Sequence, residues 1–496
     1  MRNFAMPAGA PAPPDRAQSG TDADTATATT TVTTTVTVAA GMLAPGHLGE
    51  LTGQIPFELV DAVLEQTRTT QRRLRALPSR VGMYFVLALG LFPALGYQKV
   101  WGTLVAGLRA LPVPTPSEKA LRALRRRLGP APFKALFEVL AGPVGGPRTP
   151  GVRFGRYRTV AFDGCTSIKV ADSDRNRGWL GKMNAARGVT GYPVVELMTL
   201  VETGTRALLG AVFGPPAVGE TDYARRLLAL LGPTMLVLGD RGFDAAEFLA
   251  ELADTGAQYL VRLRGNRRLP LLTRCDDASF LSRLGERTVR IITADITVTC
   301  ADGTRYTGTY RLATTLLDPR QYPASTLIGL YHERWEHELS YLALRHTLLE
   351  GHVLRSSDPP GLEQELWALL TLYQALRRAM VTAVDTVPGT DPDRASFTTA
   401  LATARSLLIT AEGVVTEHVD LAGHIGRAVL ADLLSPRRPR TSVRKVKSPL
   451  SRYHKKDPYR PERSTAITAL KITINHTGTT PPTTHQDQCL TSAPPP

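Results

Sequence analysis

The chain has 496 residues, of which 43% are hydrophobic and 21% charged, a composition typical of globular proteins with room for two or three domains. Its 59 lysines and arginines outnumber 44 acidic residues, and the net charge of +15 indicates a polyanionic partner, most often nucleic acid, although an anionic membrane surface also fits. The four cysteines are scattered without a CxxC pair, which excludes a zinc ribbon and a disulfide scaffold and fits a reducing cytoplasm.

The first 145 residues fall into two segments. Residues 1–44 are rich in Ala, Pro and Thr and hold few large apolar groups, so we predict that they are disordered. Residues 45–145 have helical periodicity and form a predicted N-terminal DNA-binding domain. The apolar run 81–97 is interrupted by three glycines and a proline and is bracketed by Arg80 and Lys99, so it predicts a buried helix and no membrane span.

A short basic helix is predicted near the end of this domain. Ser117 is its expected N-cap, Gly129 ends it, and Arg122 and Arg126 are among its cations. Two interpretations stay open. The helix could lie on DNA as a recognition helix does, or it could be a solvated basic face, because clustered charge supplies affinity for phosphate but does not read bases.

The periodicity changes after a Gly/Pro-rich linker at 142–151. Short strands then alternate with helices, which predicts an α/β sheet with parallel and antiparallel parts in a domain spanning 152–434. Residues 265–315 carry short strands only and predict a β-rich insertion, and helices follow it. The tail 435–496 is strongly basic in its first half, and we predict that it is disordered and binds polyanions.

One long helix is predicted between Pro323 and Gly351 from its Leu-rich pattern. At about 100° per residue, four of its polar side chains fall within an arc of roughly 60°. These four are Tyr331, Arg334, Glu338 and Arg345. Taken alone, the stripe could be no more than a salt bridge between Arg334 and Glu338, which stabilises a helix by a few tenths of a kcal/mol, about 0.2–0.5.

Two further acids could meet Glu338. Asp163 and Asp240 each follow a predicted strand, and in an open α/β sheet the strand ends border the crevice where ligands bind. Three carboxylates are hard oxygen ligands that suit Mg²⁺ or Mn²⁺, and two such ions about 4 Å apart support in-line phosphoryl transfer. Arg334 and Arg345 would then bind phosphates beside the metal ions.

These residues resemble the DDE transposases of the insertion sequence four family, whose signature is Tyr-x2-Arg-x3-Glu-x6-Lys around the catalytic Glu. The chain carries Tyr331, Arg334, Glu338 and Arg345 at those spacings, with Arg at the last position where the family usually has Lys. The segments AFDGCTSIKVADSDRN around Asp163, VLGDRGFD around Asp240 and LAPGHLGELTGQIPFELVD near the N-terminus are also similar to the family. The similarity covers about residues 43–430.

The resemblance implies a ribonuclease-H-like mixed sheet with a β-rich insertion, preceded by a helical domain. It implies a catalytic, metal-binding triad of Asp163, Asp240 and Glu338, with cleavage at transposon ends and strand transfer into target DNA by the freed 3′-OH. The expected partners are double-stranded DNA, as terminal inverted repeats and target, and a second copy of the chain in a homodimeric synaptic complex. The expected setting is the nucleoid in the bacterial cytoplasm.

Two alternatives share these residues. A catalytically inactive DNA-binding relative could act as a repressor or scaffold, and a metal-dependent nuclease could cut without joining. Some relatives also form a hairpin intermediate and hold a flipped base on a Trp of the insertion. Because residues 265–315 contain no Trp, Tyr306 or Tyr310 is the candidate for that position here.

Overall fold

The computed structural model describes residues 46–435 and 467–475, apart from 74–75, 109–112, 183, 186–187, 190, 301–304, 333–339 and 415–419. The described residues all belong to one compact unit, which begins at Met42. The predicted disordered segment 1–44 and most of the tail 435–496 lie outside them.

The N-terminal part is helical. Its helices are α1 (Phe57–Gln66), α2 (Ser79–Leu91), α3 (Tyr97–Val105), α4 (Glu118–Leu128) and α5 (Ala131–Leu140). The apolar run 81–97 does not form one helix: α2 ends at Leu91 and α3 begins at Tyr97, because Pro93 has no N–H to continue the helix. Almost every residue of α2 is buried, which explains why the run is apolar all round. Of the helices that the structure describes, none has both the length and the hydropathy to cross a membrane.

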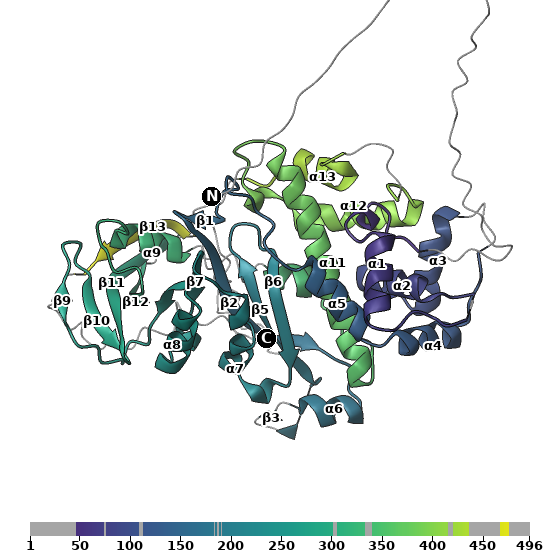
Figure 1. Cartoon of the computed structure of the whole chain (residues 1–496), viewed down its shortest axis with the longest axis horizontal. Coiled ribbons are helices and arrows are strands. Elements are labelled where there is room, and N and C mark those ends of the chain that lie inside the picture. Colours follow the sequence, from purple (N-terminus) through teal and green to yellow (C-terminus); the bar gives the residue numbers. More distant parts are fainter. Residues whose placement is uncertain are drawn as a thin grey trace, which may run out of the picture. The chain divides into compact units, whose positions relative to one another are not determined.

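The central sheet confirms the predicted ribonuclease-H-like arrangement (Figure 1). Its strands are β2 (Tyr157–Lys169), β5 (Val194–Glu202), β6 (Leu208–Gly214), β7 (Met235–Gly239) and β8 (Gln258–Arg262), in the order β6-β5-β2-β7-β8. The first three strands in the chain pair antiparallel, whereas β7 runs parallel to both β2 and β8. In such a sheet, ligands bind at the strand ends where the strand order reverses. Here that point is beside β2 and β7.

Helices cover the two faces of this sheet. One face packs on α7 (Glu220–Arg225) and α8 (Ala246–Asp254) through Phe162, Val237 and Phe248. The other face of β7 packs on α9 (Ala324–His332) through Leu238 and Leu327. Side chains alternate between the two faces along β7. A residue just beyond the strand can therefore be assigned to a face by counting from Leu238.

The predicted β-rich insertion is confirmed, and it extends the same sheet. The strands β9 (Thr273–Arg274), β10 (Phe280–Leu284), β11 (Arg287–Cys300) and β12 (Arg305–Thr314) follow β8 in the order β12-β11-β10-β9, all antiparallel. Because β10 covers only Arg287–Ile291 of β11, the rest of β11 has an open edge on that side.

Residues 467–474 overturn part of the prediction for the tail. They form β13 (Ile467–Ile474), which pairs with Ala294–Cys300 of β11. The strand is rich in Ile and Thr, and it covers an edge whose N–H and C=O groups would otherwise face water. Asn475 continues the pairing and donates from its side chain to Asp295 Oδ2 at 2.7 Å.

Three C-terminal helices connect the sheet to the N-terminal helices (Figure 1). They are α11 (Pro359–Asp385), α12 (Phe397–Thr410) and α13 (Gly423–Ala431), and α11 contacts α2 and α5. The buried ion pair of Arg125 with Glu365, 3.0 Å long, ties α4 to α11. The shorter elements are η1 (Leu51–Gly53), η2 (Ala106–Leu108), β1 (Arg153–Phe154), α6 (Asp174–Leu180), β3 (Asn184–Ala185), β4 (Gly188–Val189), η3 (Pro216–Val218), η4 (Leu228–Leu230), η5 (Arg241–Phe243), η7 (Ala343–Leu348) and η8 (Pro392–Arg394).

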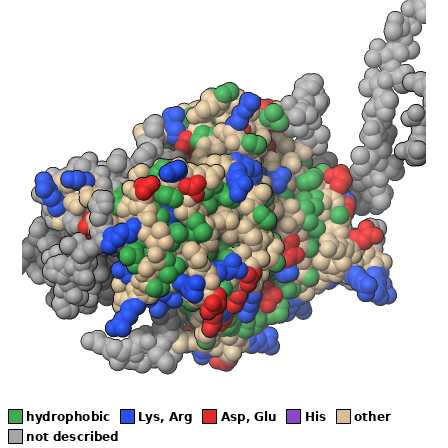
Figure 2. All heavy atoms as spheres, turned by 60° about the vertical axis from the view of Figure 1, so that its left-hand side comes forward, with side chains coloured by type: hydrophobic (Ala, Val, Ile, Leu, Met, Phe, Trp, Pro, Cys, Tyr) green, Lys and Arg blue, Asp and Glu red, His purple; other side chains and the backbone are tan. Residues whose placement is uncertain are grey.

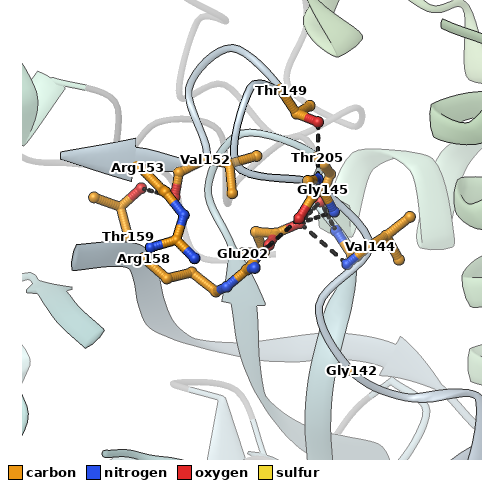
Figure 3. A network of polar contacts seen from close by, with 12 residues as sticks. Gly142, Val144, Gly145, Thr149, Val152, Arg153, Arg158, Thr159, Glu202 and Thr205 are labelled. Atoms are coloured by element: carbon orange, nitrogen blue, oxygen red, sulfur yellow. Dashed lines mark hydrogen bonds and ion pairs between the residues drawn. The ribbon is translucent and has the colours of Figure 1, made fainter. Parts of the chain in front are cut away.

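A fully buried carboxylate holds the linker against the sheet (Figure 3). Glu202, at the end of β5, forms an ion pair with Arg158 of β2 and accepts hydrogen bonds from Thr205 Oγ1 and from the backbone N–H of Gly145 at 2.9 Å. The 142–151 linker is thus attached to both β2 and β5 through one side chain.

Replacing Glu202 by Ala should lower the free energy of unfolding by about 3–5 kcal/mol, because the change leaves Arg158 and two other donors without their buried partner. The measurement is chemical denaturation followed by circular dichroism. The control is Glu138→Ala, which breaks the exposed pair with Lys134 and should change stability by less than about 0.5 kcal/mol. Equal effects of the two substitutions would contradict the role given to Glu202.

Candidate active site

The register between β2 and β7 brings Asp163 and Asp240 to the same level. Ala161 of β2 is paired with Leu238 of β7, so two residues further along these parallel strands Asp163 and Asp240 occupy corresponding positions. Neighbouring strands lie about 4.8 Å apart. The two acids, 77 residues apart in the sequence, therefore flank the same point of the crevice.

Asp163 lies inside a strand and not at a strand end as predicted. β2 continues unbroken to Lys169, and Asp163 is paired with Thr199 of β5. The exposed edge arises on the other side, because β7 ends at Gly239 and leaves β2 without that neighbour from this level onward. The crevice is thus made by the shorter strand, and the structure does not describe the Asp163 side chain.

Asp240 is the first residue after β7. Its carboxylate Oδ1 accepts a hydrogen bond of 2.7 Å from the N–H of Gly242 and so caps the turn η5. Leu236 and Leu238 face the cluster beneath α9, and side chains alternate along a strand, so Asp240 belongs to the α9 face. The cap holds the carboxylate in one direction at the edge of the sheet.

The helix α9 is anchored next to Asp240 by Tyr331. The phenol is 4% exposed and donates a hydrogen bond of 3.2 Å to the carbonyl of Gly239, the last residue of β7. A side chain so buried positions the helix, and the predicted contact of Tyr331 with DNA stays a prediction. Arg334 and Glu338 lie in the segment 333–339, outside the described residues, so their predicted roles stay predictions.

The structure places Arg345 outside a regular α-helix. It lies in η7, a π-helical turn whose backbone bonds join residues five apart, so the 100° spacing of an α-helix does not apply to it. Its Nε donates to Nε2 of His346 at 3.0 Å. The predicted contact of Arg345 with DNA stays a prediction.

A residue that the sequence analysis missed is Arg262, the last residue of β8. Gly239 is paired with Val261, which places Arg262 next to Asp240 in the adjacent strand. Its guanidinium lies 4.0 Å from the ring centroid of Tyr310, a cation–π contact that restricts its direction. A single Arg closing the apolar strand Tyr259–Val261 was the available signal.

Tyr310 is not free to hold a flipped base. It is 7% exposed, with Arg262 over its face and the ring of Tyr331 edge-on at 6.1 Å. The structure does not describe the side chain of the other candidate, Tyr306. The rings of Tyr310 and Tyr331 instead connect the insertion sheet to α9.

The residue after Asp163, Gly164, lies close to two carboxylates. A Cβ on Gly164 would lie 2.8 Å from Oε1 of Glu220 and 2.9 Å from Oε1 of Glu196, closer than real Cβ atoms approach other atoms. Two carboxylates that the sequence analysis did not single out therefore lie beside the backbone of the first predicted catalytic acid. Glu196 comes from β5 and is 2% exposed, and Glu220 begins α7.

Other nearby acids have structural partners. Asp172 accepts hydrogen bonds from Arg177 and Lys182, and the bond from Arg177 is the largest cause of its lowered pKa. Asp244 is buried and accepts a 3.0 Å hydrogen bond from the N–H of Arg264. These acids shape the loops around the crevice.

The carboxylates of the crevice have the chemistry of a divalent-cation site. Asp163 and Asp240 are hard oxygen donors on adjacent strands, as Mg²⁺ or Mn²⁺ requires. Within the part of the chain that the structure describes, no group of three Asp, Glu, His or Cys side chains converges. That part excludes Glu338 and the Asp163 side chain, so the predicted triad is not tested by it.

The basic helix α4 forms as predicted, with the Ser117 hydroxyl accepting from the N–H of Ala120 at 3.2 Å. The arginines of this helix differ in their contacts. Arg122 forms an ion pair with Glu118 and lies over the ring of Tyr97, whereas Arg126 is exposed. The predicted contacts of Arg122 and Arg126 with DNA stay predictions.

Comparisons with known proteins agree with this architecture. Residues 45–138 match the family described as insertion element 4 transposase N-terminal, and residues 155–374 match the family described as transposase DDE domain. The chain is 24% identical over 435 residues to the transposase InsG for insertion sequence element IS4 of Escherichia coli K12, covering 83% of this chain and 93% of that protein. It is 28% identical over 141 residues to the putative transposase InsZ of the same organism, covering 28% of this chain and 47% of that protein.

Among solved structures, the chain is similar to a piggyBac transposase synaptic complex with hairpin DNA. The TM-score is 0.40 and the sequence identity 10%, over 79% of this chain and 86% of that chain. A similarity of this size is too weak to inform the fold or the mechanism.

Replacing Gly164 by Ala should lower the free energy of unfolding by about 1–3 kcal/mol, because the new methyl group has to displace Glu196 or Glu220. The matched control is Gly178→Ala in α6, where a Cβ would meet nothing within 4 Å and should stabilise the helix by up to about 1 kcal/mol. Thermal unfolding of both variants is the measurement. A Gly164→Ala protein as stable as the parent would contradict the crowding described here.

Proposed function

The chain belongs to the insertion sequence four family of DDE transposases, and from this we propose that Asp163, Asp240 and Glu338 are its catalytic triad. The observation that carries the proposal is the β2–β7 register, which gives the first two acids adjacent positions at the crevice. The third acid follows Tyr331 by seven residues in the sequence, and Tyr331 is bonded to the residue before Asp240.

The transposase DDE domain implies the use of a divalent metal ion. We propose Mg²⁺ or Mn²⁺, as two ions, with Asp163, Asp240 and Glu338 as the residues that hold them. When bound, such ions activate the attacking oxygen and stabilise the leaving oxygen of an in-line phosphoryl transfer. The acids must be ionised to serve as ligands, and the hydrogen bond from the Gly242 N–H fixes the direction of the Asp240 carboxylate.

Positive side chains beside the acids would orient the DNA. Arg262 neighbours Asp240 and is held over Tyr310, so its guanidinium can bind the phosphate next to the scissile bond without first being ordered. Arg334 and Arg345 would act on the same backbone from the part of the chain that follows α9. In this assignment Tyr331 and Tyr310 are positioning residues for the acids and for Arg262.

The partners that we propose are the terminal inverted repeats and the target, both double-stranded DNA. The N-terminal helices would hold the repeat, with Arg122 and Arg126 among the contacts, while the sheet domain cuts and joins. Two copies of the chain would bring two transposon ends together as a homodimer, at the nucleoid of a bacterial cell. The family membership supports DNA as the partner.

Neutral replacements of the triad, Asp163→Asn, Asp240→Asn and Glu338→Gln, should each reduce cleavage of a duplex carrying the terminal repeat by more than about a hundredfold. This is because changes in the outer shell of a metal site alone cost about 10–100-fold. The assay measures nicked and joined products with Mg²⁺ or Mn²⁺, and chelation of the metal should abolish both products. Asp174→Asn, whose carboxylate is 98% exposed, is the control and should cleave normally.

The products also separate the alternatives. Cleavage without joined product would favour a nuclease that does not transpose. Tight binding of the repeat by the parent protein without any cleavage would favour the inactive DNA-binding relative. Cleavage that survives Glu338→Gln would remove that residue from the triad.

Replacing Arg262 by Ala should slow cleavage by roughly 10- to 100-fold, which corresponds to the loss of a charge-assisted hydrogen bond worth about 1.5–3 kcal/mol. Binding of the uncut repeat should change much less, because many other phosphate contacts remain. The control is Arg283→Ala, an exposed arginine on β10 of the same sheet. Equal cleavage rates for the two variants would show that Arg262 does not act at the site.

A further inference from the structure

A hollow lined by basic side chains lies in the N-terminal domain. Its volume is about 340 Å³, and it is lined by Arg68, Thr69, Thr70, Gln71, Arg72, Arg73 and Arg127. Four of the seven lining residues are arginines and none is acidic. The first six form the loop after α1, and Arg127 reaches it from the last turn of α4.

The charge of this hollow is not neutralised from within. The segment 67–80 contains five arginines and no acidic residue. Among the described N-terminal helices and loops, ion pairs are formed by Arg80, Arg122, Arg125 and Lys134, and Arg68, Arg72 and Arg73 are exposed and take part in none. On the face shown in Figure 2, by contrast, Lys and Arg side chains are dispersed and mixed with acidic ones.

The loop that carries these arginines is rigidly held. The N–H of Thr69 donates to the carbonyl of Leu64 at 2.8 Å, and Ser79 donates from its hydroxyl to the carbonyl of Thr69 and from its N–H to Oε1 of Gln71, both at 2.8 Å. Arg127 donates to the carbonyl of Leu77 at 2.7 Å from the opposite side. These bonds hold Thr69 and Gln71 in place without a ligand, which lowers the entropic cost of binding.

Arg68 adds an independent sign of function. It has φ = 55°, a left-handed conformation that follows the end of α1. Glycine is the usual residue at such a position because a side chain is strained there. The chain instead places a long cation there, and residues kept in a strained conformation cluster at binding sites.

We propose that this arginine hollow binds backbone phosphates of duplex DNA. The inference rests on the proposed function and adds the place where the N-terminal domain holds the DNA. Guanidinium groups bind phosphate oxygens in a bidentate manner, and the hydroxyls of Thr69 and Thr70 offer further donors. Such contacts set the position of the duplex but do not read bases.

The basic helix α4 contributes to the hollow at its C-terminal end, through Arg127. Arg125 is buried against Glu365, Arg122 is paired with Glu118, and α4 packs on α2 through Leu124 near Gly82. A helix engaged in this way contributes a cation to the hollow from its end, at Arg127, and is not presented as a free recognition helix.

The test is a triple variant of the full chain, Arg68→Ala, Arg72→Ala and Arg73→Ala, binding a fluorescent duplex with the terminal repeat over a series of salt concentrations. Each phosphate contact contributes about 0.9 to the slope of log K against log salt concentration, so the slope should fall by about 2–3. Affinity at low salt should fall at least tenfold. The control removes the same charge elsewhere, with Arg226→Ala, Arg283→Ala and Arg320→Ala, all exposed in the sheet domain, and should keep the slope within about 1 of the parent.

The outcomes separate this proposal from the proposed function. With the triad intact, the triple variant should still cleave once DNA is saturating, at a rate close to that of the parent. A parent protein that binds and cleaves, together with a triple variant of unchanged affinity and slope, would overturn the phosphate site alone. A triple variant that binds DNA normally but loses binding to vesicles of anionic phospholipid would overturn it in favour of a membrane surface. A parent that neither binds nor cleaves would overturn both.

Discussion

The active site depends on the parallel pairing of β2 with β7. Parallel strands point their carboxyl ends the same way, and the register of Ala161 with Leu238 sets the level at which the two acids meet. The short length of β7 then matters as much as its register. Because β7 ends at Gly239, β2 continues without β7 as its neighbour from the level of Asp163 onward. A shift of one residue in this pairing would move every β7 side chain to the opposite face and separate the acids.

Everything else around the crevice supports these two strands. Glu196 and Glu220 lie against Gly164 on one side, and Tyr331 fixes α9 to the last carbonyl of β7 on the other. The insertion sheet contributes through Tyr310, which contacts both Tyr331 and Arg262. The insertion is thus part of the support of the site, and β13 completes the edge of the sheet on which that support depends.

In the proposed function, the N-terminal domain holds DNA and the sheet domain cuts it. The acids and Arg262 lie on the central sheet, whereas the arginine hollow lies in the loop between α1 and α2. The long helix α11 connects the two parts, because it contacts α2 and α5 and is tied to α4 by the pair of Arg125 and Glu365. DNA held in the N-terminal domain therefore has a defined relation to the sheet through packed helices.

The fold class and the family could be predicted from sequence alone, because both depend on local signals, and the same signals predict the three acids. Alternating apolar residues predict strands, an acid after an apolar strand predicts a crevice residue, and the spacing of Tyr331, Arg334, Glu338 and Arg345 carries the family signature. The tertiary structure decided what depends on pairing and packing between distant segments. Strand register placed Arg262 beside Asp240, packing buried Tyr331 and Tyr310, Arg345 came to lie in a π-helical turn, and β13 paired with the open edge of β11. Local sequence does not determine these features, because contacts between separate segments, such as the Tyr331 hydrogen bond to Gly239 across 92 residues, form only when the segments have been brought together.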